Sequence, residues 1–175
     1  MSITYTVWYT WDGCSIPEEE ETHFSLQFLN NGDLQLQIDA PFFNDPPPAS
    51  KPGSCWKLWE YEVVEIFLVG EDGQYTELEF APHGHYLTLR FDAPRSVIAQ
   101  EEGLEYQAEI VGQRWNGHAI VPKKLLPPSI YRVNCFAIHG QNEERRYLCH
   151  WPLPQYEKPD FHQPSRFPLF PKDAL

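Results

Sequence analysis

Long apolar runs, a basic surface and closely spaced cysteines are all missing from this 175-residue chain. No stretch approaches the ~20 apolar residues that a membrane-spanning helix needs, so we expect no membrane association. Thirteen Lys and Arg stand against 25 Asp and Glu, which gives a formal net charge of −12. Because proteins that bind the phosphate backbone present a basic face, this balance argues against a nucleic-acid partner.

The cysteines show no pattern typical of a metal site. Cys14, Cys55, Cys135 and Cys149 include no Cys-x-x-Cys pair, which argues against a zinc ribbon. The first residues, MSITYTVWYTWDG, lack a basic stretch followed by an apolar core, so we expect no secretory signal. We therefore predict free thiols and a cytoplasmic location, where thiols stay reduced.

Aromatic residues and proline are abundant. Phe, Tyr and Trp make up 15% of the chain, and there are 17 Pro. Aromatic residues favour strands, whereas Pro favours sheet edges and rigid loops. The length fits one domain, so we predict a single domain over residues 1–175. We expect its Pro-rich tail, 152–175, to dock on the rest of the domain. The rings expected to make the contact are Trp151, directly before the tail, and Phe161, Phe167 and Phe170 within it.

Alternating apolar and polar residues predict many short strands. In 33–39 the alternation is complete, as in a half-buried strand. Further strand-like segments are 22–29, 65–70, 85–91, 105–111 and 131–140. The only helix candidate is a turn at 122–126, which two prolines end. We predict an all-β fold, an antiparallel β-sandwich of about nine or ten strands.

One predicted hairpin, residues 58–84, carries several glutamates among its apolar residues. A tight turn centred on Asp72-Gly73 places Glu77 and Glu79 on one sheet face and Glu65 on the other. A single bulge would shift the register and bring Glu65 to the face of Glu77 and Glu79. Either register puts at least one carboxylate on an apolar face, where it is costly unless it is paired.

Three interpretations of these glutamates stay open. The glutamates lie on a solvated face, or Glu65 is buried and tied to an arginine or to backbone N–H groups, or carboxylates on a concave sheet face accept hydrogen bonds from ligand hydroxyls. Sugar sites combine flat aromatic rings with carboxylates in this way. The apolar residues expected to be buried are Phe67, Leu78, Phe80, Leu87, Leu89 and Ile138.

Six strings, TWDG, APFFNDPPP, LWEYEVVEIFL, YTELEFAPHGHYLTL, NCFAIHG and PDFH, together resemble a family of small DOMON-like domain proteins of unknown function. The resemblance extends from Thr10 to His162 and implies a β-sandwich. The DOMON superfamily includes haem binders with Met and His ligands. Because Met1 is the only methionine here, we expect no haem and no other cofactor.

The hairpin more distantly resembles the family 9 carbohydrate-binding modules, through Trp59, Glu65 within VVEIF, Tyr75 and the turn at 81–84. The resemblance implies that Trp59 stacks on a sugar ring, that Glu65 binds its hydroxyls, and that a second Trp faces the first. Trp151 is the candidate for that second ring. The predicted ligand-binding set is Trp59, Glu65, Glu77, Glu79, His83 and Trp151, with Trp11 and Trp56 as neighbours.

Fewer residues support a metal site or a catalytic site. His83 and His85 share a strand face and offer metal ligands, although turn histidines bonded to the backbone are the simpler interpretation. Resemblance to family 9 modules makes Asp12, Asp39 and Asp45 candidates for a structural calcium. Paired carboxylates are the only catalytic constellation present, so the sequence leans against an enzyme without deciding the question.

We predict a non-catalytic binding module for a small ligand, with carbohydrate as the first candidate. The alternative is an intracellular protein-interaction or scaffold domain without a sugar site. Two parallel Trp rings flanking a carboxylate would favour the sugar site, whereas a single exposed Trp without a facing ring would favour the scaffold. The sequence gives neither the ligand nor the oligomeric state.

Overall fold

The computed structural model describes residues 2–153 and 157–171, and within them it is all-β, as predicted. The strands are β1 Ser2–Val7, β2 Tyr9–Thr10, β3 Thr22–Phe28, β4 Leu34–Pro41, β5 Gly53–Ser54, β6 Val63–Gly70, β7 Tyr75–Phe80, β8 His85–Ala93, β9 Ser96–Gln100, β10 Glu105–Val111, β11 Arg114–Val121, β12 Ile130–His139 and β13 Arg146–Cys149. Short 3-10 helices are η1 Glu18–Glu20, η2 Leu58–Glu60, η3 Lys123–Leu125, η4 Asn142–Glu144 and η5 Pro164–Arg166.

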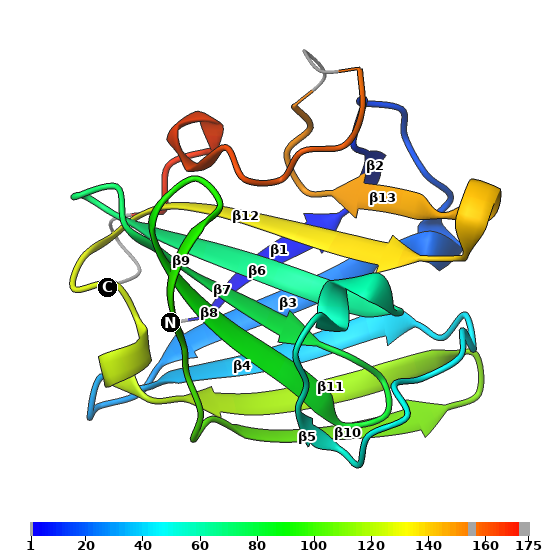
Figure 1. Cartoon of the computed structure of the whole chain (residues 1–175), viewed down its shortest axis with the longest axis horizontal. Coiled ribbons are helices and arrows are strands. Elements are labelled where there is room, and N and C mark those ends of the chain that lie inside the picture. Colours follow the sequence, from blue (N-terminus) through cyan, green and yellow to red (C-terminus); the bar gives the residue numbers. More distant parts are fainter. Residues whose placement is uncertain (1, 154–156, 172–175) are drawn as a thin grey trace.

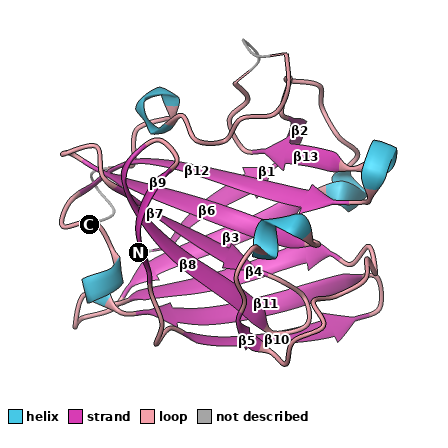
Figure 2. Cartoon of the chain, viewed as in Figure 1, coloured by secondary structure: helices cyan, strands magenta, loops and turns pink. Residues whose placement is uncertain are grey.

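The strands form two sheets, which Figures 1 and 2 show as stacked layers with the helices confined to connections. The smaller sheet has the order β1-β3-β4-β11-β10, and the larger has β2-β13-β12-β6-β7-β8-β5 with β9 beside β8. Apart from β5, which is parallel to β8, the pairs are antiparallel. The predicted antiparallel β-sandwich is therefore confirmed.

The sandwich has thirteen strands among the described residues, more than the nine or ten expected. Six strands, β1, β2, β5, β9, β11 and β13, lie outside the segments named from the sequence, and two of them show why. β9 is largely exposed on both faces, so its sequence carries no alternation. In β11 two of the inward positions are held by Gly117 and Ala119, which are too small to mark a buried face.

Two apolar cores lie on opposite faces of the larger sheet. The first lies between the sheets and contains Leu36 from the smaller sheet with Leu78 and Phe80 from the larger. The second is built from the outward face of the larger sheet, which a simple two-layer sandwich would leave in water. All six residues expected to be buried are at most 5% exposed, namely Phe67, Leu78, Phe80, Leu87, Leu89 and Ile138.

The C-terminal segment 157–171, coloured orange to red in Figure 1, covers the second core. Phe161 stacks on Phe136 of β12 with 3.9 Å between the ring centroids, and Phe167 is buried beside them. Phe170 reaches the core between the sheets. The expectation for Trp151 was wrong, because its side chain is 51% exposed. Residues 154–156 and 172–175 of the predicted tail lie outside the described residues.

The connections are irregular apart from the short 3-10 helices. The helix candidate at 122–126 is the 3-10 turn η3, and no helix in 2–153 or 157–171 is long and apolar enough to span a membrane. Cys14, Cys55, Cys135 and Cys149 are free thiols, as predicted.

Candidate functional site

The register of the β6–β7 hairpin decides where its glutamates lie. Gly70 donates its N–H to the carbonyl of Gln74 at 2.8 Å, so the loop consists of Glu71, Asp72 and Gly73. Gly73 adopts a φ of +83°, which is typical of a hairpin loop one residue longer than a tight turn. The register of the tight turn was therefore wrong, and the longer loop has the effect predicted for a bulge.

With this register, three carboxylates share the outward face of the larger sheet. Glu65 lies opposite Glu79, and Phe67 lies opposite Glu77. The exposed fractions of Glu65, Glu77 and Glu79 are 2%, 3% and 0%. The interpretation of a solvated face was thus wrong for this group, because the second core covers it.

These carboxylates have few partners. Oε2 of Glu77 and both carboxyl oxygens of Glu79 are buried without a hydrogen-bond donor from any other described residue. One carboxyl oxygen of Glu77 and one of Glu79 lie within 4.8 Å of each other. The interpretation made for Glu65 holds in part, because Glu65 is buried and the charge of Arg145 acts on it.

Burial raises the pKa of all three carboxyl groups. The pKa of Glu65 rises to about 8, although the positive charge of Arg145 acts to lower it. For Glu77, burial is reinforced by the charge of Glu65, and for Glu79 by the charges of Glu77 and Glu65; both pKa values lie well above the ordinary range. Without a bound cation, the cluster accordingly retains protons near neutral pH.

Glu62 has a different role from the other hairpin glutamates. Its two carboxylate oxygens accept N–H groups of Phe43 and Asp45 at 2.9 and 3.0 Å. Burial raises its pKa, and these backbone hydrogen bonds act in the opposite direction. Such a tie to backbone N–H groups was considered for Glu65 from the sequence, and the structure shows it at Glu62, where it anchors the Pro-rich loop after β4.

A pocket of about 320 Å³ opens above the carboxylates. Glu65, Phe67 and Glu77 lie on its floor. Its walls include Trp59, Arg95, Tyr147, Phe161 and His162. The pocket therefore combines aromatic rings with carboxylates, which is the composition that the sequence predicted for a sugar site.

Arg145 holds the Trp59 side of the pocket in place. Its guanidinium donates to the carbonyls of Trp59, Tyr61 and Gly140 at 2.6, 3.2 and 2.9 Å. Trp59 belongs to η2, the one-turn helix that precedes β6. Arg145, from the connection between η4 and β13, thus positions Trp59, which was assigned to the predicted hairpin from the sequence.

Contacts between the C-terminal segment and the sheet hold the opposite wall. Arg95, after β8, pairs with Asp160 at 2.6 Å. A hydrogen bond of 2.9 Å joins the Tyr75 hydroxyl to Nδ1 of His162. Burial lowers the pKa of His162 to about 4, so its ring is neutral at physiological pH.

Three of the six predicted site residues, Glu79, His83 and Trp151, do not line this pocket. Trp151 lines a separate, much smaller cavity with Trp11 and Phe161. The His83 ring packs edge-on against Phe42 at 5.7 Å between centroids. The structure therefore brings together Trp59, Glu65 and Glu77, with Glu79 beside them, and leaves His83 and Trp151 outside.

The paired-Trp arrangement of the family 9 modules is not present at Trp59. The ring recorded against it is Trp56, at 5.2 Å between centroids and 80° between planes, which is an edge-on contact. Trp56 is itself half exposed. A sugar bound here would stack on a single indole face.

The aspartates and histidines considered for metals have partners of their own. Asp12 accepts from the Thr10 hydroxyl, Asp39 pairs with Arg114 at 2.7 Å, and Asp45 accepts the Gly140 N–H at 2.6 Å. Their role as calcium ligands stays a prediction. Nε2 of His85 lies 3.0 Å from the Ser50 carbonyl, in agreement with a histidine bonded to the backbone.

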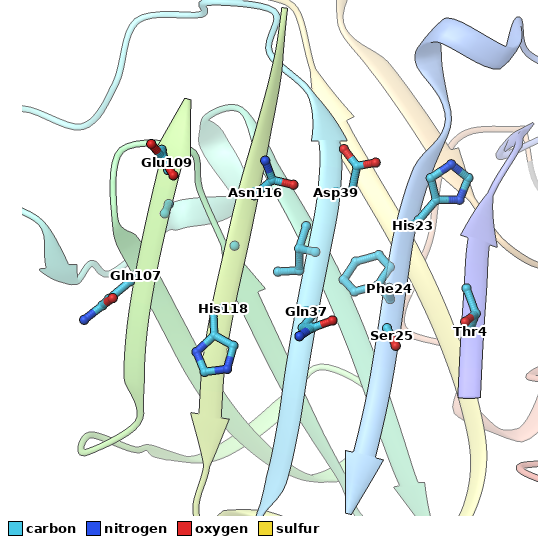
Figure 3. A pocket seen from close by; sticks show the side chains of 13 residues that line it. Thr4, His23, Phe24, Ser25, Gln37, Asp39, Gln107, Glu109, Asn116 and His118 are labelled. Carbon is cyan, nitrogen blue, oxygen red and sulfur yellow. The ribbon is translucent and has the colours of Figure 1, made fainter. Parts of the chain in front are cut away.

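A second pocket of about 480 Å³ lies on the outer face of the smaller sheet (Figure 3). Polar side chains from neighbouring strands line it, among them Gln37, Gln107, Asn116 and His118. Phe24 supplies the only phenyl ring among the lining residues, and this side chain is fully buried. Because it offers no aromatic face for stacking, it fits a solvated sheet surface better than a sugar site.

Comparison with solved structures defines the class of fold. The chain is a β-sandwich similar to the crystal structure of a "putative carbohydrate-binding protein" from Bacteroides uniformis, with a TM-score of 0.69. The similarity covers 94% of this chain and 84% of that one, at 15% sequence identity. At this identity the likeness shows the fold alone.

Comparison with curated sequences shows the family, and the chain belongs to the UPF0462 family. It is 39% identical over 183 residues to the UPF0462 protein C4orf33 of Homo sapiens, covering 99% of this chain and 90% of the relative. The Mus musculus and Danio rerio homologues are 38% and 37% identical, and 93% and 91% of their lengths are covered. No family model matches the chain. The DOMON-like assignment stays a prediction.

Proposed function

We propose that the chain is a non-catalytic module that binds a carbohydrate in the pocket above Glu65 and Glu77. One observation carries the proposal: the half-buried Trp59 ring lines the same cavity as the buried Glu65 and Glu77, and Oε2 of Glu77 has no hydrogen-bond donor among the described residues. Sugar rings present C–H faces to aromatic rings and hydroxyls to carboxylates. The carbohydrate-binding description of the fold neighbour supports the same direction.

Each wall of the pocket then has a role. Trp59 stacks on the apolar face of a sugar ring, while Glu65 and Glu77 accept hydrogen bonds from its hydroxyls. The Arg95 guanidinium, at the opposite wall, donates to a ring or hydroxyl oxygen. A cavity of about 320 Å³ suits one terminal sugar residue and not a long chain.

The experiment is a thermal-shift screen of the protein against mono- and disaccharides, followed by calorimetric titration of any sugar that raises the melting temperature. Binding to the native state raises the melting temperature by mass action. Trp59→Ala should abolish the shift. Trp8→Ala should leave it unchanged, because Trp8 is exposed and lines none of the pockets described above. The proposal fails if no sugar shifts the protein at millimolar concentration or if Trp59→Ala binds as tightly.

A protein-interaction domain is the second candidate, and the edge-on Trp56–Trp59 contact favours it. Without a facing parallel ring, Trp59 lacks the sandwich geometry of the sugar-binding modules. Trp56 and Trp151 are each 51% exposed, and exposed indoles are common anchors at protein interfaces. A negative sugar screen, together with a partner whose affinity falls on Trp56→Ala, would support this second candidate.

A further inference from the structure

The three glutamates of the second core form the most compact group of ligating side chains in 2–153 and 157–171. One carboxylate oxygen from each of Glu65, Glu77 and Glu79 can be chosen so that all lie within 4.8 Å of one another. Nothing in the packing of an apolar core requires three carboxylates at one place. Their arrangement therefore calls for a partner that the protein itself does not supply.

We propose that Glu65, Glu77 and Glu79 bind one divalent cation of the oxygen-preferring class, with Ca²⁺ as the best fit. Calcium is coordinated by oxygen at about 2.3–2.6 Å, so ligands on opposite sides of one ion lie about 5 Å apart. The limit of 4.8 Å between the carboxylate oxygens is compatible with a single central ion of this size. This inference does not depend on the identity of any sugar.

The state of Glu79 is the independent observation that points to a ligand. Its side chain is completely buried, and neither carboxyl oxygen has a donor from the described residues. Oε2 of Glu77 is buried in the same way. A buried carboxylate without a donor loses its hydration and gains no compensating hydrogen bond, which destabilises the folded state. A cation at the centre satisfies all three groups at once.

The chemistry of the donors selects the class of ion. The three ligands are carboxylates, with no imidazole or thiolate in the group. Carboxylate oxygens suit Ca²⁺, Mg²⁺ and Mn²⁺, whereas zinc and copper sites usually include histidine or cysteine. When ionised, the three carboxylates carry a formal charge of −3. The positive charges of Arg145 and Arg95 act on Glu65 and Glu77, but these two charges do not balance three negative ones.

The pocket gives the ion a path and completes its coordination. Glu65 and Glu77 line the cavity, so an ion held between them and Glu79 is reached from the solvent side. Calcium takes about 6–8 ligands, and three carboxylates leave positions for water or for a ligand hydroxyl. The site is therefore open to the pocket on one side, where a second ligand can reach the ion.

Proton release separates this proposal from a cluster that simply stays protonated. Carboxyl groups that ligate an ion must give up any protons that they carry. Calorimetric titration in two buffers with different ionisation enthalpies measures the number of protons released. A protonated cluster without an ion site gives no saturable heat in either buffer.

The test uses the whole chain, stripped with EDTA and titrated separately with CaCl₂, MgCl₂ and MnCl₂ in the absence of sugar. We expect saturation at one ion per chain, release of protons and a rise in melting temperature. Glu79→Gln should weaken binding by more than the roughly tenfold that loss of an outer-shell partner costs. Glu109→Gln removes an equal charge from an exposed position of β10 and should leave affinity unchanged.

If Glu79→Gln does not fold, which circular dichroism will show, Glu77→Gln replaces it as the ligand variant. Saturable binding of any of the three ions that is lost in the ligand variant supports the site. The absence of saturable binding at millimolar concentration, or equal affinity in the ligand variant, overturns it. If the cation binds but no sugar does, the cation site is supported and only the carbohydrate proposal is contradicted.

Discussion

Glu65 of β6 and Glu79 of β7 are directly opposed across two antiparallel strands, and both side chains are buried. Like charges at such a position destabilise a sheet. The pair therefore remains neutralised in the folded state, either by protons or by a bound cation. Its energetic consequences are measurable even before any ligand is known.

Stability of the EDTA-treated protein should fall as the pH rises from about 5 to about 8. The unfolded carboxyl groups ionise near pH 4.3, whereas burial raises the folded pKa of Glu65 to about 8. Between these values the folded state holds more protons, so each unit of pH removes at most about 1.4 kcal/mol per group. The stability is fully present below the unfolded pKa and is lost as the pH passes the folded pKa.

Urea unfolding at a series of pH values measures this slope. Glu65→Gln should flatten the profile, because the amide carries no titrating proton. Glu109→Gln, at the exposed surface, should keep the slope of the unmodified protein. Identical slopes for the unmodified protein and Glu65→Gln would contradict the proposed protonation of the cluster.

Glu62→Ala should destabilise the protein by about 2–5 kcal/mol, because it leaves the N–H groups of Phe43 and Asp45 without their acceptor. Glu60→Ala is the matched control. Its carboxylate pairs with Lys57 at 3.3 Å, but both side chains are more than half exposed, so the expected loss is below about 1 kcal/mol. Denaturant unfolding of both variants compares them, and equal losses would show that Glu62 does not anchor the loop.

Two buried threonines should respond in opposite ways to substitution by valine. The Thr76 hydroxyl donates to the Leu125 carbonyl at 2.7 Å, so Thr76→Val should cost about 1–3 kcal/mol. The Thr88 hydroxyl is buried without a hydrogen-bond partner in the part of the chain that the structure describes, so Thr88→Val should be neutral or stabilising. The difference in free energy of unfolding between the two variants is the measurement. A larger loss at Thr88 would mean that its hydroxyl has a partner, such as a water molecule.

Gly140→Ala should be more harmful than Gly73→Ala. Both glycines have positive φ, +77° and +83°, so alanine carries a backbone penalty of about 1–2 kcal/mol at either position. A Cβ on Gly140 would in addition overlap the carbonyl of Glu144, whereas a Cβ on Gly73 meets nothing within 4 Å. Thermal unfolding should place Gly140→Ala at least about 1 kcal/mol below Gly73→Ala.

Period-two patterns predicted much of the fold because they report burial directly. The segment 105–111 coincides with β10, and 22–29 and 131–140 match β3 and β12 to within one residue at each end. The strand β9 was not predicted, because neither of its faces is buried. The hairpin register could not be fixed from the sequence, because one added loop residue moves every side chain to the other face.

The floor of the candidate site was predictable, but its walls were not. Trp59, Glu65, Glu77 and Glu79 lie close together in the sequence, so local strand geometry brings them near one another. Arg95, Tyr147, Phe161 and His162 come from separate connections and from the C-terminal segment. Their convergence depends on how that segment crosses the sheet, and no local pattern encodes such a path. The same limit led to the wrong expectation for Trp151.

The covering of the larger sheet by residues 157–171 gives the pocket an order of assembly. Its carboxylate floor comes from the middle of the chain, and the wall formed by Phe161 and His162 comes from near its end. During synthesis the floor therefore leaves the ribosome long before the wall exists. A chain that stops before Pro159 contains every strand of both sheets but lacks the Phe161 and His162 wall that helps to enclose the glutamates.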